Sequence, residues 1–169
     1  MSRFLRKKIV FMKKFDITVP VKSLQYEELD DTRKHLVDLA RQYTYRSYAP
    51  YSHFSVGAAI ALDNGEVVCG ANQENAAFSS GTCAERSACF AAGAAWPDAK
   101  FKCIAIAARG VDGDELASPI APCGACRQSL LEYETLAGGP VEVLLVGAKA
   151  IYQVPSIKDL LPLAFTEIN

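Results

Sequence analysis

Short apolar runs that predict β-strands recur along this chain from residue 55 onward. The first of them, SVGAAIAL, is apolar on both faces, which is typical of a central strand covered on two sides. The predicted strands are residues 55–62, 66–71, 102–108, 141–146 and 151–154. Asp63-Asn64-Gly65 separates the first two strands and predicts a hairpin with a type I′ turn, because Asn-Gly readily adopts the positive φ angles of that turn.

Three longer segments predict α-helices. The first begins at Asp30-Asp31, where carboxylates suit the positive end of a helix, and its apolar residues recur at helical spacing. It is expected to end at about Tyr48, because Ala49 precedes Pro50 and a residue before proline is biased toward extended geometry. The other two predicted helices are residues 83–95 and 123–136.

The connections between these elements limit how the strands can be arranged. Helices join the second strand to the third and the third to the fourth, and such a crossover is the connection that parallel strands need. Only residues 147–150 separate the last two strands, so those two are expected to form a hairpin. The predicted fold is α/β, a three-layer α-β-α sandwich with a five-stranded mixed sheet.

The first 29 residues differ from the rest of the chain. Ile17, Val19 and Val21 occupy alternate positions, as in a short strand or an extended arm, and Pro20 interrupts the pattern. Residues 1–29 are therefore predicted to be an N-terminal extension and residues 30–169 a single domain. Half of the residues are hydrophobic, which suits one compact domain with a full core.

The net charge of −1 hides an uneven distribution. Six of the 18 basic residues lie in the first 14 positions, where no acidic residue occurs, which leaves 12 basic against 19 acidic residues in the remainder. A nucleic-acid-binding protein would carry a basic surface on its folded body, so the expected partner is a small molecule. No apolar run approaches the ~18 residues of a membrane span, and Ile9-Val10-Phe11 is too short for a signal-peptide core, so neither a membrane partner nor export is expected.

Six cysteines in a chain without an export signal favour a reducing compartment, and hence the cytoplasm, with metal binding in place of disulfides. Cys69, Cys89 and Cys103 lie inside apolar segments. They are predicted to be buried packing residues, since a free cysteine behaves as a small hydrophobe.

Cys83, Cys123 and Cys126 are predicted to bind one Zn²⁺ per chain. Cys123 and Cys126 are three residues apart, so on a helix both sulfurs point the same way. Both helices follow strands, which brings the three thiolates to the strand carboxyl ends, where open α/β sheets bind their ligands. A structural zinc normally has four Cys or His ligands, whereas a catalytic zinc has three and keeps a water. No fourth Cys or His accompanies either cluster, and Glu85, two residues after Cys83, is the predicted catalytic acid and base of a hydrolytic site.

The motifs Thr82-Cys83-Ala84-Glu85-Arg86 and Pro122-Cys123-Gly124-Ala125-Cys126 also form a signature: a Cys, a Glu two residues later, then Pro-Cys-x-x-Cys. Over roughly residues 30–165 the chain resembles the homotetrameric zinc-dependent cytidine deaminases of the cytidine/deoxycytidylate deaminase superfamily. The resemblance implies a catalytic domain that hydrolyses cytidine and deoxycytidine to uridine and deoxyuridine, with release of ammonia, in pyrimidine salvage. It also implies that Arg86 donates hydrogen bonds to the thiolates of Cys123 and Cys126.

The resemblance extends to segments that would bind the nucleoside. Residues 51–58 and 72–76 are similar to the family's nucleoside-binding segments. By that match, Asn72 and Glu74 hold the ribose hydroxyls and Phe54 stacks near the base. The assignment is chemically sensible, because a neutral sugar calls for amide and carboxylate groups, whereas a phosphate would call for Arg or Lys.

Two further positions follow from the same resemblance. Ala84 is assigned to the substrate site, and Phe165 is expected to reach the active site of a neighbouring subunit in a homotetramer with shared sites. The match departs at residues 78–81, where the family would have a tyrosine and a proline. Arg127 is interpreted as a charge on the helix surface, and His53 as an exposed loop residue that does not bind the metal.

The sequence leaves three alternatives open. A blasticidin-type nucleoside deaminase has similar zinc motifs, although residues 72–75 speak against it. A structural-zinc binding module is opposed by the three-ligand count and by Glu85. An enzyme that edits polynucleotides is opposed by the acidic body of the chain.

Overall fold

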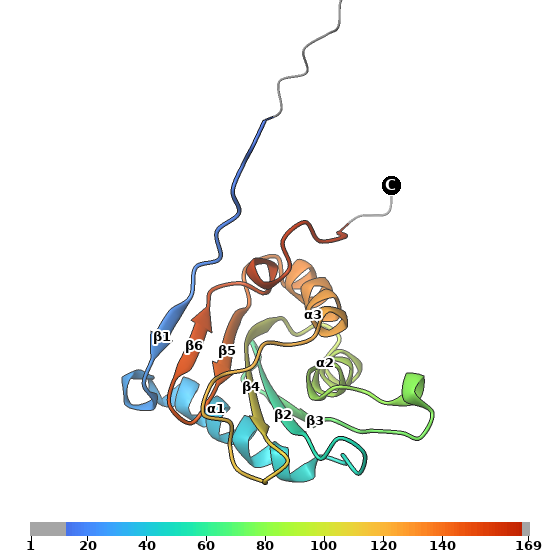
Figure 1. Ribbon diagram of the computed structural model, residues 1–169. Helices are drawn as coiled ribbons and strands as arrows, with labels where there is room; N and C mark the ends of the chain where they lie inside the picture. The colour runs from blue at the N-terminus through green and yellow to red at the C-terminus, as the bar shows by residue number, and fades with distance from the viewer. Residues whose placement is uncertain (1–12, 167–169) are drawn as a thin grey trace, which may run out of the picture.

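The computed structural model describes residues 13–166, except for the side chain of Phe78. These residues form a six-stranded mixed β-sheet of order β1-β6-β5-β4-β2-β3, with α1 on one face and α2 and α3 on the other (Figure 1). The strands are β1 (Lys22–Leu24), β2 (Ser55–Leu62), β3 (Val67–Ala71), β4 (Phe101–Arg109), β5 (Glu142–Val146) and β6 (Ile151–Val154). The helices are α1 (Asp31–Tyr43), α2 (Ala84–Ala95) and α3 (Gly124–Ala137), with 3-10 turns η1 (Tyr26–Glu28), η2 (Thr44–Arg46), η3 (Phe78–Ser80) and η4 (Ile157–Leu160). The predicted three-layer α-β-α sandwich is confirmed.

The sheet has six strands, and the prediction of five is corrected. The additional strand, β1, lies at the edge of the sheet and pairs antiparallel with β6. It is three residues long and only Leu24 is half-buried, so its sequence carries no alternation of apolar and polar residues. Residues 13–21 precede it without regular secondary structure, and residues 1–12 of the predicted extension lie outside the described residues.

The pairing of the strands follows the predicted connections with one difference. β5 and β6 form the expected antiparallel hairpin, and α3 joins β4 to its parallel neighbour β5. β3 and β4 also run parallel, but they are not neighbours, because each pairs antiparallel with β2, which lies between them. The crossover through α2 therefore passes over one strand.

The β2–β3 hairpin forms as predicted, but its turn is not type I′. That turn requires positive φ at two successive residues, whereas Gly65 has φ 89° and Asn64 is not among the residues with positive φ. The Gly65 amide donates to the carbonyl of Leu62 at 3.2 Å, and the Leu62 amide donates to the carbonyl of Glu66 at 2.9 Å. The loop therefore has three residues, of which only the glycine adopts the left-handed conformation.

The end of the first helix differs from the prediction. α1 ends at Tyr43 and continues as η2 only to Arg46, short of the predicted end near Tyr48. The Thr44 hydroxyl donates to the Arg41 carbonyl at 2.7 Å, and such side-chain bonds compete with regular helix hydrogen bonding.

None of the helices within residues 13–166 is long and apolar enough to cross a membrane.

Successive residues of the central strands point to opposite faces and fill two cores. On β2, Ala58 and Ile60 pack under α2 and α3, whereas Ala59 packs under α1. Gly70 on β3 allows α2 to approach the sheet closely, because a Cβ at this position would lie 2.4 Å from the Ala88 amide nitrogen. Small residues thus set the distance between the sheet and the helix that carries part of the site.

The three cysteines predicted to pack in the core do so to different degrees. Cys89 is fully buried between α2 and the sheet. Cys69 and Cys103 are half-buried and pack against the core under α1. Burial raises the pKa of the Cys69 thiol to about 11 and that of the Cys89 thiol to about 12, so both stay protonated near neutral pH.

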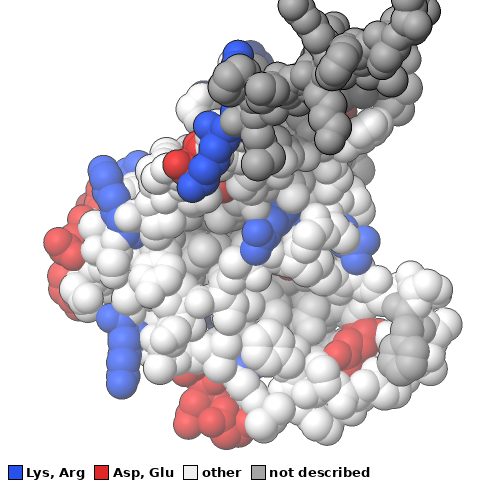
Figure 2. Space-filling view, turned by 45° about the horizontal axis from the view of Figure 1, so that its top comes forward, with Lys and Arg blue, Asp and Glu red and all other residues white. Residues whose placement is uncertain are grey.

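Charged side chains on the face drawn in Figure 2 are spread out. Lys and Arg stand apart from one another among uncharged residues, and acidic residues are visible at the left margin, at the bottom and within the right-hand part of the view. Among the described residues on this face, no continuous basic patch is visible. This distribution agrees with the acidic composition of the body of the chain.

Candidate metal centre

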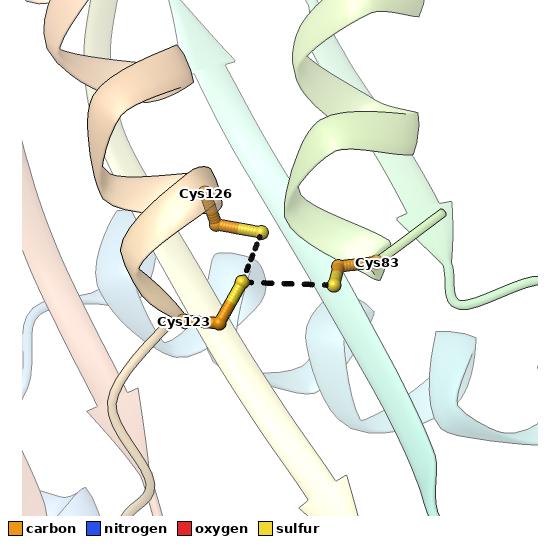
Figure 3. A group of neighbouring side chains, drawn as sticks. All are labelled: Cys83, Cys123 and Cys126. Atoms are coloured by element: carbon orange, nitrogen blue, oxygen red, sulfur yellow. Dashed lines mark hydrogen bonds between the residues drawn. The ribbon is translucent and has the colours of Figure 1, made fainter. Parts of the chain in front are cut away.

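Three thiols from two helices meet at one point (Figure 3). Cys83 is the N-cap of α2, Cys123 is the N-cap of α3, and Cys126 lies in the first turn of α3. The Sγ atoms of Cys83 and Cys123 are 3.9 Å apart, and those of Cys123 and Cys126 are 3.4 Å apart. All three lie within 4.8 Å of one another. The fold therefore brings together the three cysteines that the sequence singled out.

This donor set fits a zinc ion. Tetrahedral coordination at a zinc–sulfur distance of about 2.3 Å separates the sulfurs by roughly 3.8 Å, close to the two sulfur–sulfur distances of the cluster. Within residues 13–166, no fourth Cys, His or carboxylate belongs to the group. A three-ligand set of this kind is typical of catalytic zinc sites, in which a water takes the fourth position.

Positive charge surrounds the three sulfurs. As N-caps, Cys83 and Cys123 lie beside the unpaired amides of the first turns of α2 and α3, where the partial positive charge of a helix favours a thiolate. Arg86 adds a full charge one turn further along α2. Its Nε–H is buried and has no hydrogen-bond partner within the described residues, so this donor is free to serve an anion held at the site.

The thiols do not share negative charge equally. Hydrogen bonding from Cys126, aided by Cys123 and Arg86, lowers the pKa of Cys83 to about 5 against the opposing effect of burial. The hydrogen bond with Cys83, together with burial, raises the pKa of Cys126. The negative charge of one thiolate thus opposes ionisation of the neighbouring thiol. A cation bound among the sulfurs offsets the repulsion between thiolates, so such sites release protons when metal binds.

Glu85 lies in the first turn of α2 beside this cluster and is only 4% exposed. Burial raises the pKa of its carboxyl group, and the negative charge of Cys83 acts in the same direction. A carboxyl group with a raised pKa can accept and return a proton near neutral pH, as acid–base catalysis requires. The geometry is compatible with the role predicted for Glu85.

A cleft of about 540 Å³ opens beside Cys83 and Arg86. Its other lining residues come from three short segments, residues 51–52, 72–75 and 81–82. Two backbone hydrogen bonds between Gln73 and Thr82, of 2.9 and 2.8 Å, hold the second segment against the third. The volume lies in the range of small-molecule sites.

Asn72 lines the cleft, but most of its side-chain amide is used within the chain. Its Oδ1 accepts hydrogen bonds from the Ser47 hydroxyl at 2.6 Å and the Val56 amide at 2.7 Å, and its Nδ2 donates to the Phe54 carbonyl at 2.9 Å. One N–H of Nδ2 is left to face a ligand. Asn72 therefore also holds the loop that carries Phe54.

Glu74 is held by the segment of residues 51–52, which also lines the cleft. Its Oε2 accepts hydrogen bonds from the backbone amides of Tyr51 at 2.9 Å and Ser52 at 3.2 Å. The Ser52 hydroxyl and these amides lower the pKa of the carboxyl group, so Glu74 is ionised at neutral pH. Both backbone bonds go to one oxygen, which leaves Oε1 for a ligand.

Three of the residues predicted to bind substrate do not line the cleft as the described residues form it. Phe54 is half-buried, and Ala84 is completely buried in the first turn of α2. Phe165 is 67% exposed, and its carbonyl accepts a 2.8 Å hydrogen bond from the side-chain Nε2 of Gln128. Their roles stay predictions.

The interpretation of Arg127 as a surface charge is wrong. Its Nε donates to the Pro122 carbonyl at 2.8 Å and its Nη1 to the Leu160 carbonyl at 2.7 Å. No local pattern reveals these bonds, because the C-terminal residues reach α3 only in the folded chain. His53, in contrast, is an exposed loop residue as predicted.

Several residues that shape the site carried no functional signal in the sequence. Ser47 precedes its hydrogen-bond partner Asn72 by 25 residues, a separation that no motif spans. Gly81 lines the cleft, and a Cβ at this position would lie 3.0 Å from the Gln73 carbonyl. A glycine in a polar loop was the only available sign of that close approach.

Comparison with known proteins identifies relatives of the whole domain. A family model described as "Cytidine and deoxycytidylate deaminase zinc-binding region" matches residues 30–137. The cytidine deaminase of Halalkalibacterium halodurans is 37% identical over 134 residues, which cover 79% of this chain and 94% of that protein. The cytidine deaminase of Mycobacterium tuberculosis is 39% identical over 129 residues, which cover 75% of this chain and 84% of that protein.

Solved structures agree with these sequence matches. The crystal structure of cytidine deaminase from Burkholderia pseudomallei superposes with a TM-score of 0.66 at 40% identity, and the match covers 78% of this chain and 97% of that one. The crystal structure of cytidine deaminase from Mycobacterium tuberculosis superposes with a TM-score of 0.61 at 32% identity, over 82% of this chain and 100% of that one. The family match over residues 30–137 includes all three cysteines of the thiol cluster.

Proposed function

This chain belongs to the family of zinc-binding cytidine and deoxycytidylate deaminases, and from that premise we propose that its cleft is the active site of a cytidine deaminase. The enzyme is a hydrolase that acts on the C–N bond of a cyclic amidine and converts cytidine to uridine with release of ammonia. Deoxycytidine is the second substrate in this proposal. The observation that carries it is the three-thiol cluster with a buried glutamate beside a cleft of about 540 Å³.

The metal ligands are Cys83, Cys123 and Cys126, and they hold one Zn²⁺ per chain. Zinc, when bound, supplies the Lewis acidity that makes a water molecule nucleophilic near neutral pH. Three negative sulfurs weaken that acidity. The positive ends of α2 and α3 and the guanidinium of Arg86 offset this, because they draw negative charge away from the sulfurs.

Glu85 moves the protons of the reaction. Water adds its oxygen to C4 of the pyrimidine while Glu85 takes one of its protons and passes it to N3. Glu85 then takes the second proton and delivers it to the amino group at C4. That group leaves as ammonia, and C4 keeps the oxygen as a carbonyl. One carboxyl group that can exchange protons is sufficient for both transfers.

Asn72 and Glu74 bind the sugar. The ionised Glu74 accepts a hydrogen bond from a sugar hydroxyl, and the remaining Nδ2–H of Asn72 donates one. Phe54 stacks near the base, and Ala84 contributes its first-turn backbone to the substrate site. Among the residues that line the described cleft, Arg86 is the only Lys or Arg, and it interacts with Cys83 of the thiol cluster. The sugar side carries the acidic Glu74, which favours a neutral nucleoside over a nucleotide.

The assembly in this proposal is a homotetramer with shared active sites. Its support is the resemblance to the tetrameric family and the exposure of Phe165, which is 67% in the single chain. Residues 30–169 form the catalytic domain and residues 1–29 an extension, as the start of the family match at residue 30 suggests. The enzyme works in pyrimidine salvage in the cytoplasm, a reducing compartment that suits its six free cysteines, without a membrane or nucleic-acid partner.

A direct assay tests the proposal. The purified zinc-loaded protein is incubated with cytidine, deoxycytidine, cytosine and CMP, and the change in ultraviolet absorbance on deamination is followed. We expect rapid turnover of both nucleosides and much slower turnover of cytosine and CMP. Turnover of blasticidin without turnover of cytidine would favour the rival deaminase, and equal rates with CMP would remove the assignment of a neutral sugar site.

A further inference from the structure

Helix α3 holds the end of the described chain through three of its side chains. Residues 156–165, the C-terminal segment, run along α3 and include η4 (Figure 1). Arg127 donates to the Leu160 carbonyl at 2.7 Å, and Gln128 donates to the Phe165 carbonyl at 2.8 Å. Glu134 binds the start of the same segment. The backbone of the segment is therefore held by side chains of α3, in addition to the Ser156 hydroxyl, which donates to Glu134 at 2.8 Å, and the buried side chains of Ile157 and Leu160.

The turn η4 is held at both of its ends. Glu134, which is 8% exposed, accepts hydrogen bonds at 2.8 Å from the Ile157 amide and at 3.2 Å from the Lys158 amide, at the start of the turn. Arg127 binds the Leu160 carbonyl at its end. A carboxylate at the amide end and a guanidinium at the carbonyl end both match the partial charges of a helical turn.

Arg127 also binds the loop that leads into α3. Its Nε donates to the carbonyl of Pro122 at 2.8 Å, and Pro122 is buried and directly precedes Cys123. In addition, the Arg127 amide donates to the Cys123 carbonyl at 3.0 Å. One guanidinium thus connects the backbone beside a metal ligand to the backbone at the end of η4.

We propose that Arg127 is a positioning residue that couples the loop before Cys123, which leads into α3, to the C-terminal segment. Correct placement of Cys123 and correct placement of residues 160–165 stabilise each other through this one side chain. The inference rests on the proposed function, in which Cys123 binds zinc and Phe165 completes the site of a neighbouring subunit. Metal binding in one subunit thereby orders the residue that this subunit delivers to another.

Only an arginine has the geometry for this connection. Nε and Nη1 are donors at fixed angles in one planar group, whereas the ammonium of lysine is a single point that cannot reach two separated carbonyls at hydrogen-bond distance. A buried carbonyl that loses its donor keeps the cost of desolvation. Because the coupling is an equilibrium property, each partner must affect the other by the same factor.

The first arm of the test uses the unmodified holoenzyme. Hydrogen–deuterium exchange of peptides from residues 157–166 is measured with zinc bound and after removal of zinc by a chelator. We expect removal to speed exchange in this segment by roughly fivefold or more, while peptides from α1 stay unchanged and report that the fold is intact. Exchange in residues 157–166 that is unaffected by zinc removal would overturn the proposal.

The second arm uses Arg127→Lys, which keeps the charge, with Gln128→Ala as the matched control. Gln128 lies next to Arg127 and binds the same segment, but it has no bond to the loop before Cys123 among the described residues. We expect Arg127→Lys to release zinc to a chromogenic chelator roughly fivefold faster or more, and its residues 157–166 to exchange at one fast rate with and without zinc. Gln128→Ala should release zinc at the unmodified rate.

Two results of the second arm would contradict the proposal. They are an unmodified zinc-release rate in Arg127→Lys, and faster release of equal size in Gln128→Ala. If Arg127→Lys fails to fold, the exchange measurement on the unmodified enzyme still tests whether zinc binding and residues 157–166 are coupled. Cytidine turnover is measured separately. If the coupling is found but cytidine is not deaminated, the proposed function is rejected and this inference stands.

Discussion

At the scale of single residues, Glu85, next to Cys83 of the thiol cluster, and Glu74, which lines the cleft, are placed in opposite surroundings. Burial and the nearby thiolate raise the pKa of Glu85, whereas hydrogen bonds from the Ser52 side chain and the 51–52 amides lower the pKa of Glu74. Glu85 can therefore carry a proton near neutral pH while Glu74 remains an anion. Such divergence between two acids indicates a division of roles, one for proton transfer and one for binding.

The role of Glu85 is tested by Glu85→Gln. The amide keeps the size of the side chain but cannot exchange protons, so turnover of cytidine should fall by roughly 10²–10⁴-fold while one zinc per chain is retained. Zinc is measured by atomic absorption and turnover by ultraviolet assay. Glu132→Gln, which changes an exposed glutamate of α3, is the control and should keep full activity. Near-normal turnover in Glu85→Gln would remove this residue from the proton transfers.

The role of Glu74 is tested by comparing substrates with and without the sugar. Glu74→Ala should lower kcat/KM for cytidine by roughly 30- to 1000-fold, because a charge-assisted hydrogen bond to the sugar is lost. Part of the loss should fall on kcat, since the binding energy of the unreacting sugar orients the base. The already slow reaction with cytosine should hardly change.

The cytosine reaction also separates two effects of this substitution. Glu74 holds the backbone amides of Tyr51 and Ser52, so damage to that loop would slow both substrates equally. Glu66→Ala, at an exposed position in the β2–β3 hairpin, should leave both rates unchanged. An equal loss for cytidine and cytosine would indicate a structural role for Glu74 in place of sugar binding.

At the scale of elements, the metal centre depends on how closely α2 packs on the sheet. Cys83 and Glu85 are both at the start of α2, and Gly70 on β3 faces the backbone of that helix. A Cβ at Gly70 would lie 2.4 Å from the Ala88 nitrogen and 2.6 Å from the Ala84 oxygen. Neither atom can move without the helix, so one missing methyl group determines where two site residues lie.

Gly70→Ala should therefore damage the metal centre as well as the fold. Overpacking of this kind costs typically about 1–3 kcal/mol of unfolding free energy, and displacement of α2 should also weaken zinc binding. Gly139→Ala is the control, because a Cβ there meets no atom within 4 Å and its φ is not positive. Thermal unfolding and zinc content are the measurements, and an unchanged zinc affinity in Gly70→Ala would show that the site does not depend on this contact.

At the scale of the whole molecule, the isolated chain leaves large apolar side chains uncovered near its C-terminus. Leu163 is 84% exposed and Phe165 is 67% exposed, and residues 160 and 165 are nevertheless fixed to α3 by hydrogen bonds. A segment held in place while its side chains face outward is suited to contact another subunit. This arrangement supports the proposed sharing of active sites.

Mixing two inactive variants tests that sharing. Phe165→Ala chains keep Glu85, and Glu85→Gln chains keep Phe165, so a mixed tetramer can combine an intact Glu85 with an intact Phe165 from its neighbour. We expect activity to reappear after dissociation and reassembly of the mixture, and each variant reassembled alone to stay inactive. No recovery in verified mixed tetramers would contradict the shared site, and a monomeric mass by light scattering would exclude it.

The sequence by itself determined the local elements of this protein. β2 and β6 lie within the predicted boundaries, because apolar runs and their flanking turns are encoded residue by residue. The cysteine and glutamate motifs likewise predicted which three thiols meet, since only a few residue types can bind zinc. β1 was missed as a separate strand because three mostly exposed residues have no such pattern.

Only the tertiary structure decided how distant segments hold the site. Arg127 binds the carbonyls of Pro122 and Leu160, Glu134 binds the amides at the start of η4, and Asn72 is oriented by Ser47 and by the backbone of its neighbours. Most of these partners are backbone groups, which every residue has, so the residue types in the sequence do not predict them. Tertiary packing determines which carbonyl accepts a hydrogen bond from which side chain, because buried polar groups in a folded protein are nearly always hydrogen-bonded.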